Sequence, residues 1–247
     1  MKIIPLSEGA FTIDQSKVFV PFDVAKDDLQ QRPLGSLLVE VQPFCIVTEK
    51  DILLIDTGLG YCNKDGVLQL HQNLLDNGID PMRITKVLMS HLHKDHAGGV
   101  SKEDKILNNS FLSFPYATYY VNKNEYEYAM AKGKPSYTPS EFEILGKIDN
   151  IVFTDDIGVI DGYIHYEVTA AHSPHHQVFT IKEAGEIIFF GADDAPQLQQ
   201  MKSKFVAKYD YDGKKCMELR QQWWEQGQQE HWTFLFYHDI KTPFITL

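Results

Sequence analysis

Short apolar runs recur along most of the chain, and turn-forming residues stand at their ends. Runs of this length that are rich in β-branched and aromatic residues are typical of buried strands. We therefore expect strands at 37–41, 44–47, 52–55, 86–89, 118–121, 164–168, 178–181, 187–190 and 233–237. The sequence Lys-Glu-Ala-Gly-Glu at 182–186 predicts a hairpin turn between two of these strands.

Helical periodicity appears between the predicted strands. Val67, Leu70 and Leu74 recur at helical spacing within 66–77, and Gly78 is suited to end that helix. Further helices are expected at 122–132, 196–209 and 214–229. Strands and helices alternate without the strict rhythm of a doubly wound fold, which favours mixed sheets covered by helices. No linker, repeat or low-complexity stretch divides the sequence, so we expect one domain over 1–247.

Composition and charge narrow the function classes. The chain of 247 residues is 43% hydrophobic and 23% charged, as in ordinary globular proteins. Its net charge of −11 repels phosphate backbones, which argues against a nucleic-acid partner. Cys45, Cys62 and Cys216 are far apart, so neither a disulfide framework nor a thiolate zinc site is expected. The sequence shows no membrane-span or signal-peptide pattern, and we expect a cytoplasmic protein with a small-molecule substrate and no membrane contact.

The densest chemistry lies in the run His91-Leu92-His93-Lys94-Asp95-His96, directly after the apolar segment 86–89. Imidazole and carboxylate groups are suitable ligands for Zn²⁺ and related metals. Four such groups within six residues cannot turn into an apolar core without partners. The following pair Gly98-Gly99 is expected to let the backbone turn tightly behind the ligands. The run therefore predicts a metal site at a strand end.

Three further candidate ligands follow predicted strands downstream. His172 comes after 164–168, Asp193 after 187–190, and His238 after 233–237. Each alone would be unremarkable, because a lone histidine near a strand end is more often structural. Together, in this order, they favour a site assembled from several strand ends.

These motifs resemble those of the metallo-β-lactamase superfamily over nearly the whole chain. Ile55-Asp56-Thr57-Gly58 is similar to the family's first motif, and His172-Ser173-Pro174-His175-His176 is similar to a later one, with His175 where glycine is usual. The resemblance implies an α/β fold of the α+β type, an αβ/βα four-layer sandwich of two mixed sheets with helices on the outer faces. Asp-Thr-Gly also occurs in aspartic proteases, but these need a second such aspartate, and none is present.

The resemblance also implies two divalent metal ions, with Zn²⁺ as first choice and Mn²⁺, Fe²⁺ or Co²⁺ as alternatives. It assigns His91, His93 and His172 to the first metal, and Asp95, His96 and His238 to the second. Asp193 would bridge the two, with the adjacent Asp194 as the alternative. Asp56 would not bind metal but would support the ligand loop. Asp95 and Asp193 are the expected catalytic carboxylates.

The activity implied is hydrolysis of an ester-like bond by a metal-bound hydroxide. The motif contexts look most like the N-acyl homoserine lactonase group, so a lactone is the expected substrate. In such lactonases a tyrosine follows the bridging aspartate and helps the leaving group, whereas here Asp194-Ala195-Pro196 fills that stretch. The alternatives are a glyoxalase II-type thioesterase, a phosphotriesterase, a β-lactamase, and a metal-binding relative without activity. The polar segment from Val20 to Pro33 is predicted as either a lid or the arm of a homodimer.

Overall fold

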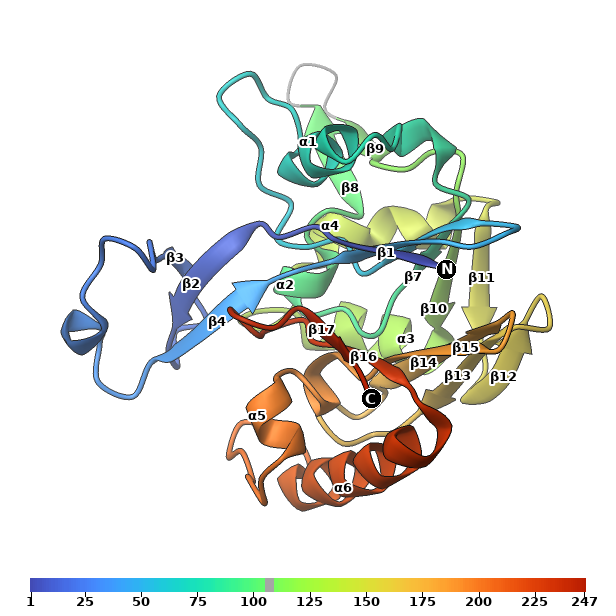
Figure 1. Cartoon of the computed structure of the whole chain (residues 1–247). Coiled ribbons are helices and arrows are strands. Elements are labelled where there is room, and N and C mark those ends of the chain that lie inside the picture. The colour runs from blue at the N-terminus through green and yellow to red at the C-terminus, as the bar shows by residue number, and fades with distance from the viewer. Residues whose placement is uncertain (105–108) are drawn as a thin grey trace.

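Two six-stranded mixed sheets face each other, as the computed structural model of residues 1–104 and 109–247 shows (Figure 1). The first sheet has the order β1 (Lys2–Pro5), β5 (Phe44–Val47), β6 (Ile52–Ile55), β7 (Lys86–Leu88), β10 (Thr118–Asn122) and β11 (Ile151–Thr154). The second has the order β12 (Ile157–Ile160), β13 (Ile164–Val168), β14 (Gln177–Glu183), β15 (Glu186–Phe190), β16 (Thr233–Leu235) and β17 (Phe244–Thr246).

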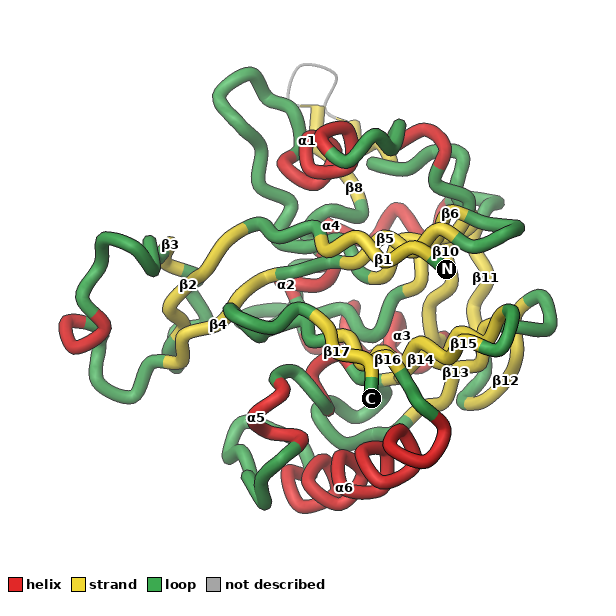
Figure 2. Tube along the Cα trace, viewed as in Figure 1, coloured by secondary structure: helices red, strands yellow, loops and turns green. Residues whose placement is uncertain are grey.

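Helices cover the outer faces of this pair of sheets (Figure 2). The α-helices are α1 (Gln69–Asp76), α2 (Lys94–Ala97), α3 (Lys123–Lys132), α4 (Pro139–Phe142), α5 (Leu198–Met201) and α6 (Gly213–Glu230). The 3₁₀ helices are η1 (Leu29–Gln31), η2 (Pro81–Arg83), η3 (Glu143–Lys147) and η4 (Ala192–Asp194). No helix in the described ranges is long and apolar enough to cross a membrane.

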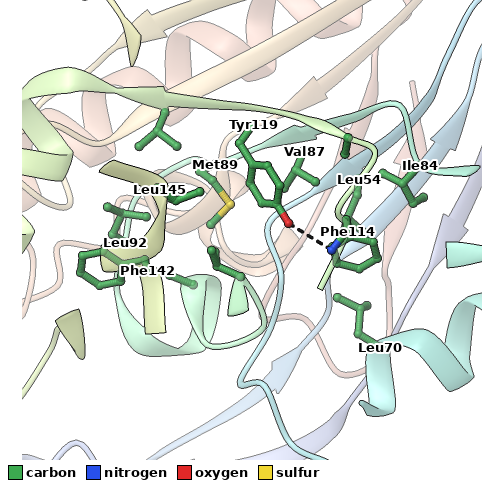
Figure 3. Packing of buried hydrophobic residues seen from close by; sticks show 14 of the residues in the cluster. Leu54, Leu70, Ile84, Val87, Met89, Leu92, Phe114, Tyr119, Phe142 and Leu145 are labelled. Carbon is green, nitrogen blue, oxygen red and sulfur yellow. Dashed lines mark hydrogen bonds between the residues drawn. The ribbon is translucent and has the colours of Figure 1, made fainter. Parts of the chain in front are cut away.

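Apolar residues on both faces of the central strands produce the layers. Successive side chains of a strand point to opposite faces. In β6, Leu53 and Ile55 pack between the sheets while Leu54 packs outward. Leu54 joins a core under α1 and α3, in which the Tyr119 hydroxyl accepts a 3.2 Å hydrogen bond from the amide of Phe114 (Figure 3). In β15, Phe190 points inward and Phe189 outward toward α6. Strands buried on both faces require helices outside, so the expected four-layer α/β sandwich is confirmed.

Two small sheets extend from the sandwich. One has the order β3 (Val20–Pro21), β2 (Gly9–Ile13) and β4 (Leu37–Val41), and the other pairs β8 (Ser101–Asp104) with β9 (Asn109–Leu112). The first projects to the left in Figure 1 and carries the segment Val20 to Pro33 away from the sheets. Its role as a lid or as a dimer arm stays a prediction.

The helix expected at 196–209 is wrong for most of its length. Only Leu198–Met201 is helical. Farther along, the amide of Tyr211 donates to the carbonyl of His172 at 3.0 Å, and that of Asp212 donates to the carbonyl of Ala171 at 2.7 Å. These donors bind the loop that follows β13, so the chain just beyond 196–209 is held against that loop instead of continuing a helix. The hairpin turn at 182–186 is confirmed, since Ala184 and Gly185 link β14 to β15 with positive φ.

The last strand is also shorter than expected, because β16 ends at Leu235. The amide of Phe236 instead bonds to the carbonyl of Pro243 at 2.8 Å. Phe236 and Tyr237 nevertheless remain buried and lead to His238.

Candidate metal centre

Five strands end at one edge of the two sheets. β6 and β7 run parallel in the first sheet, and β15 and β16 run parallel in the second; β13 and β15 are both antiparallel to β14. The loops that follow these five strands carry the predicted site residues: Asp56, His91 to His96, His172, Asp193 and His238. The fold thereby places residues far apart in the sequence at one edge of the sandwich.

The first group of potential ligands consists of His91, His93, His172 and Asp193. One nitrogen or oxygen of each lies within 4.8 Å of the corresponding atoms of the others. The Nε2 atom of His172 is 3.1 Å from Oδ2 of Asp193 and 3.2 Å from Nδ1 of His93. The Nε2 atom of His91 is 3.9 Å from the same Asp193 oxygen.

The second group consists of Asp95, His96 and His238, again within 4.8 Å of one another. The Nε2 atom of His238 is 3.0 Å from Oδ1 of Asp193, and that of His96 is 3.1 Å from it. Asp193 therefore faces the first group with Oδ2 and the second with Oδ1. The structure brings together all seven residues predicted as ligands and sets Asp193 between the groups.

Asp194 points elsewhere. Its carboxylate accepts hydrogen bonds from Thr169 Oγ1 at 2.5 Å and from the amide of His172 at 2.8 Å. Nδ1 of His176 lies 3.1 Å from it, and Arg220 donates to its backbone carbonyl at 2.8 Å. Asp194 is thus fully engaged in holding the loops around the site.

Carboxylates and carbonyls behind the imidazoles set their orientation. Oδ2 of Asp56 is 2.8 Å from Nδ1 of His96, and its Oδ1 accepts from the amide of Ser90 at 2.7 Å. Nδ1 of His238 lies 2.6 Å from the carbonyl of Glu40. Such outer partners fix which ring nitrogen faces a metal.

Three supporting residues were missed by the sequence reasoning. Asp210 Oδ1 lies 2.8 Å from Nδ1 of His172, and Glu125 accepts from the amide of Leu92 at 2.9 Å. Tyr237 stacks on His96 with ring centroids 4.1 Å apart and donates to the carbonyl of Asp95 at 2.6 Å. For Tyr237, its position next to His238 is a sequence signal that could have indicated its role. Asp210 and Glu125 have no such signal, because they reach the site through tertiary contacts.

The expected tight turn at Gly98-Gly99 is confirmed, since the amide of Val100 donates to the carbonyl of Ala97 at 3.1 Å across the two glycines. Gly98 has φ −60° and ψ −29°, an ordinary helical conformation. A side chain at Gly98 would collide with the carbonyl of Leu59, and one at Gly99 with that of Thr57. These glycines are required because the loop after β6 packs directly on the backbone behind the ligands. Positive φ angles at non-glycine residues occur near the site at Asp56, Ala170 and Ala192.

Burial and mutual charge perturb these groups strongly. Burial, followed by the charges of His96 and His93, lowers the pKa of His91 well below its usual value. Burial also lowers the pKa of His96, but Asp193 and Asp95 outweigh that effect and raise its pKa well above normal. For Asp193, burial raises the pKa, yet His238 and His96 outweigh it and hold the pKa well below the usual range. An ionised carboxylate thus sits among converging imidazoles.

The donor set fits divalent metal ions. Buried polar atoms normally have hydrogen-bond partners. Among the described residues, Nε2 of His96 and Oδ1 of Asp193 are buried without a partner of acceptable geometry, although they face each other. Imidazole nitrogens and carboxylate oxygens that converge in this way are typical ligands for Zn²⁺ and similar ions. The residues present therefore suit two cations, one for each group.

A tyrosine lies beside one of the candidate ligands. The ring of Tyr209 lies 6.3 Å from that of His172, centroid to centroid. Burial and the charges of Asp210 and Asp193 raise the pKa of Tyr209 to about 12, so its phenol keeps its proton at neutral pH. It lies at the far end of the segment 196–209, so the sequence directly after Asp193 gives no sign of it.

Comparison with known proteins agrees with this geometry. Residues 39–191 match the family described as the metallo-beta-lactamase superfamily. The N-acyl homoserine lactonase AttM of Azorhizobium caulinodans is 31% identical over 114 residues, covering 42% of this chain and 38% of the relative. The AttM lactonase of Agrobacterium fabrum is 31% identical over 127 residues, covering 47% and 44%. Each match thus spans less than half the length of the curated relative.

Solved structures share the fold across almost the whole chain. A probable metal-dependent hydrolase from Staphylococcus aureus superimposes with a TM-score of 0.79 and 20% identity, covering 99% of this chain and 91% of its own. AidC, a dizinc quorum-quenching lactonase, gives a TM-score of 0.72 and 19% identity, covering 98% and 88%. At sequence identities of 19% and 20%, these similarities show a shared fold and nothing further.

Proposed function

Because the chain belongs to the metallo-beta-lactamase superfamily, we propose that it is a metal-dependent hydrolase that opens lactone rings of the N-acyl homoserine type. The single observation that carries the hydrolase part is the position of Asp193, whose two oxygens face two separate groups of ligands. The match to AttM lactonases supports the choice of substrate.

Seven residues would hold the metals: His91, His93, His172, Asp95, His96, His238 and the shared Asp193. Two divalent ions bound there would lower the pKa of a water molecule toward neutrality and polarise a carbonyl oxygen. Hydrolysis adds this water across the acyl carbon–oxygen bond and yields a hydroxy acid. The imidazole partners Asp56 and Asp210 keep the nitrogens aimed at the centre.

Two residues of the chain handle protons in this proposal. The carboxylate of Asp95, whose Oδ2 is 3.5 Å from Nε2 of His238, orients the attacking water and accepts its proton. The protonated phenol of Tyr209, whose ring lies beside that of His172, donates a proton to the ring oxygen as it leaves. Tyr209 thereby fills the role for which the stretch Asp194-Ala195-Pro196 offers no residue.

A substrate panel tests the proposed function. Zinc-reconstituted protein is assayed against an N-acyl homoserine lactone, a thioester, a β-lactam and a phosphotriester. We expect the highest kcat/KM for the lactone. Turnover confined to the thioester, the β-lactam or the phosphotriester would replace the substrate assignment but retain the hydrolase. No turnover of any class with two metals bound would favour a metal-binding protein without activity.

A further inference from the structure

A side pocket of about 180 Å³ opens beside the ligand run. Its lining residues are Val18, Phe19, Leu59, Tyr61, Lys94 and Glu141. Lys94 lies between His93 and Asp95 in the sequence, so the pocket adjoins the candidate metal centre. Most of the wall is apolar or aromatic, and the two charged side chains are its distinctive feature.

The ammonium group of Lys94 is held in place on one side of the pocket. It donates to the carbonyl of Lys17 and lies 5.6 Å above the ring of Phe19. The backbone is fixed as well, because the amide of Lys94 donates to the carbonyl of Ser136 at 3.0 Å. An ammonium has three donors, so Lys94 retains hydrogen-bonding capacity toward the pocket.

Glu141 offers the complementary group. Its position on α4 is fixed by its carbonyl, which accepts from Ser101 Oγ at 2.7 Å. Among the described residues, Oε2 of Glu141 is buried and has no hydrogen-bond partner. The carboxylate and the Lys94 ammonium attract each other but form no direct ion pair. A buried acceptor and a nearby donor that do not satisfy each other suit a guest that brings both functions.

We propose that the side pocket binds a secondary amide of the substrate next to the reactive ring. The carbonyl oxygen of that amide accepts from Lys94, and its N–H donates to Glu141. The apolar walls formed by Val18, Phe19 and Leu59 contact the hydrocarbon attached to the amide. This assignment rests on the proposed function and names Lys94 and Glu141 as its specificity-determining residues.

The test compares two lactones of equal chain length, one with an N-acyl amide on the ring and one with a plain alkyl substituent. The variants Lys94→Met and Glu141→Leu are assayed at pH 8, because burial raises the pKa of Glu141 only to about 7. We expect KM for the amide lactone to rise about tenfold in each variant, with kcat within about threefold. KM for the alkyl lactone stays within about twofold. Matched controls are Lys214→Met and Glu218→Leu, which alter an exposed pair on α6. They should leave KM for both lactones unchanged.

An equal rise in KM for both lactones, or no rise for either, would overturn the amide assignment. If the wild-type protein opens neither lactone, the proposed function fails separately. The pocket is then tested by calorimetry on zinc-loaded protein, with two hydroxy acids that differ only in the amide. Tighter binding of the amide-bearing acid, reduced about tenfold by Lys94→Met, would sustain the pocket, and equal binding would reject it.

Discussion

The two ends of the sandwich each join the sheets through buried polar groups, but in opposite ways. At the ligand end, His96 and Asp193 have buried atoms without partners. At the far end, Asp51 accepts from Lys86 at 2.5 Å, from Tyr163 at 2.5 Å and from Thr85 at 2.7 Å. We call Asp51, Thr85, Lys86 and Tyr163 the polar clamp; none of its side chains has an unpartnered buried atom among the described residues.

This difference separates a structural cluster from a site. In the polar clamp a cation meets a carboxylate, and Asp161 lies 2.9 Å from the same Lys86 ammonium. At the ligand end, nitrogen and oxygen atoms that prefer to bind cations converge on one another. Paired charges stabilise the fold, whereas convergent ligands indicate a bound ion. Substitutions at the two ends should therefore change different properties.

The largest effect is expected at Asp193. Asp193→Asn keeps the shape but removes the charge that faces both groups of ligands. Activity should fall by more than about 100-fold. That is more than the loss of about 10- to 100-fold expected when a residue that only orients a metal ligand is removed. Metal analysis should show fewer than two ions per chain, while circular dichroism still shows a folded protein. Full activity of this variant would remove the distinction between the two ends.

In the polar clamp, Asp51→Asn should lower stability and leave chemistry intact. It leaves Lys86 with one partner, and breaking a buried pair costs about 3 kcal/mol. Urea unfolding measures this loss, and activity per folded molecule should stay within about twofold. The control Asp23→Asn breaks an exposed pair with Lys26 and should change stability by less than about 0.5 kcal/mol. An equal change in both variants would show that the clamp is not structural.

An effect of intermediate size is expected at Glu8. This buried carboxylate accepts a hydrogen bond from the amide of Leu59 at 2.6 Å. Burial raises its pKa from 4.5 to about 7. Between these values the folded state holds a proton that the unfolded chain has released, so stability falls as pH rises. The loss is at most about 3 kcal/mol.

Glu8→Gln should remove this pH dependence. As the pH rises from 5 to 8, the free energy of unfolding should therefore fall less in the variant than in the wild type. Thermal unfolding at both pH values provides the measurement. An identical pH dependence in the two proteins would show that Glu8 does not cause it.

The smallest effect is expected at Tyr237. Tyr237→Phe keeps the stack on His96 but removes the hydrogen bond to the carbonyl of Asp95. One neutral hydrogen bond contributes about 1 kcal/mol. We expect a stability loss of that size by urea unfolding, with KM unchanged and kcat reduced only a few-fold. A collapse of metal binding would instead make Tyr237 as important as the ligands.

The sequence predicts the strands and the ligand run well because both are local patterns. Leu53, Leu54 and Ile55 are apolar in succession, which marks a strand buried on both faces. The candidate ligands lie within a few residues of the ends of predicted strands. The tertiary partners leave no local pattern: Asp210 lies 38 residues from His172, and Glu125 lies 33 from Leu92.

Backbone requirements are equally hidden in the sequence. Gly98 lies in a turn as expected, but a glycine is needed there because Leu59, from a distant loop, packs against it. A helix is expected up to residue 209, but the helix ends at Met201, and farther along the amides of Tyr211 and Asp212 bind the loop of His172. Both outcomes depend on neighbours that only the folded chain supplies.

The most direct measurement is a Zn²⁺ titration of metal-free protein that follows ring opening of N-hexanoyl homoserine lactone. The proposal predicts almost no turnover without metal and a rate that reaches its plateau at two equivalents per chain. Full turnover in the metal-free protein would contradict the metal centre. A fully loaded protein that leaves the lactone intact would contradict the substrate.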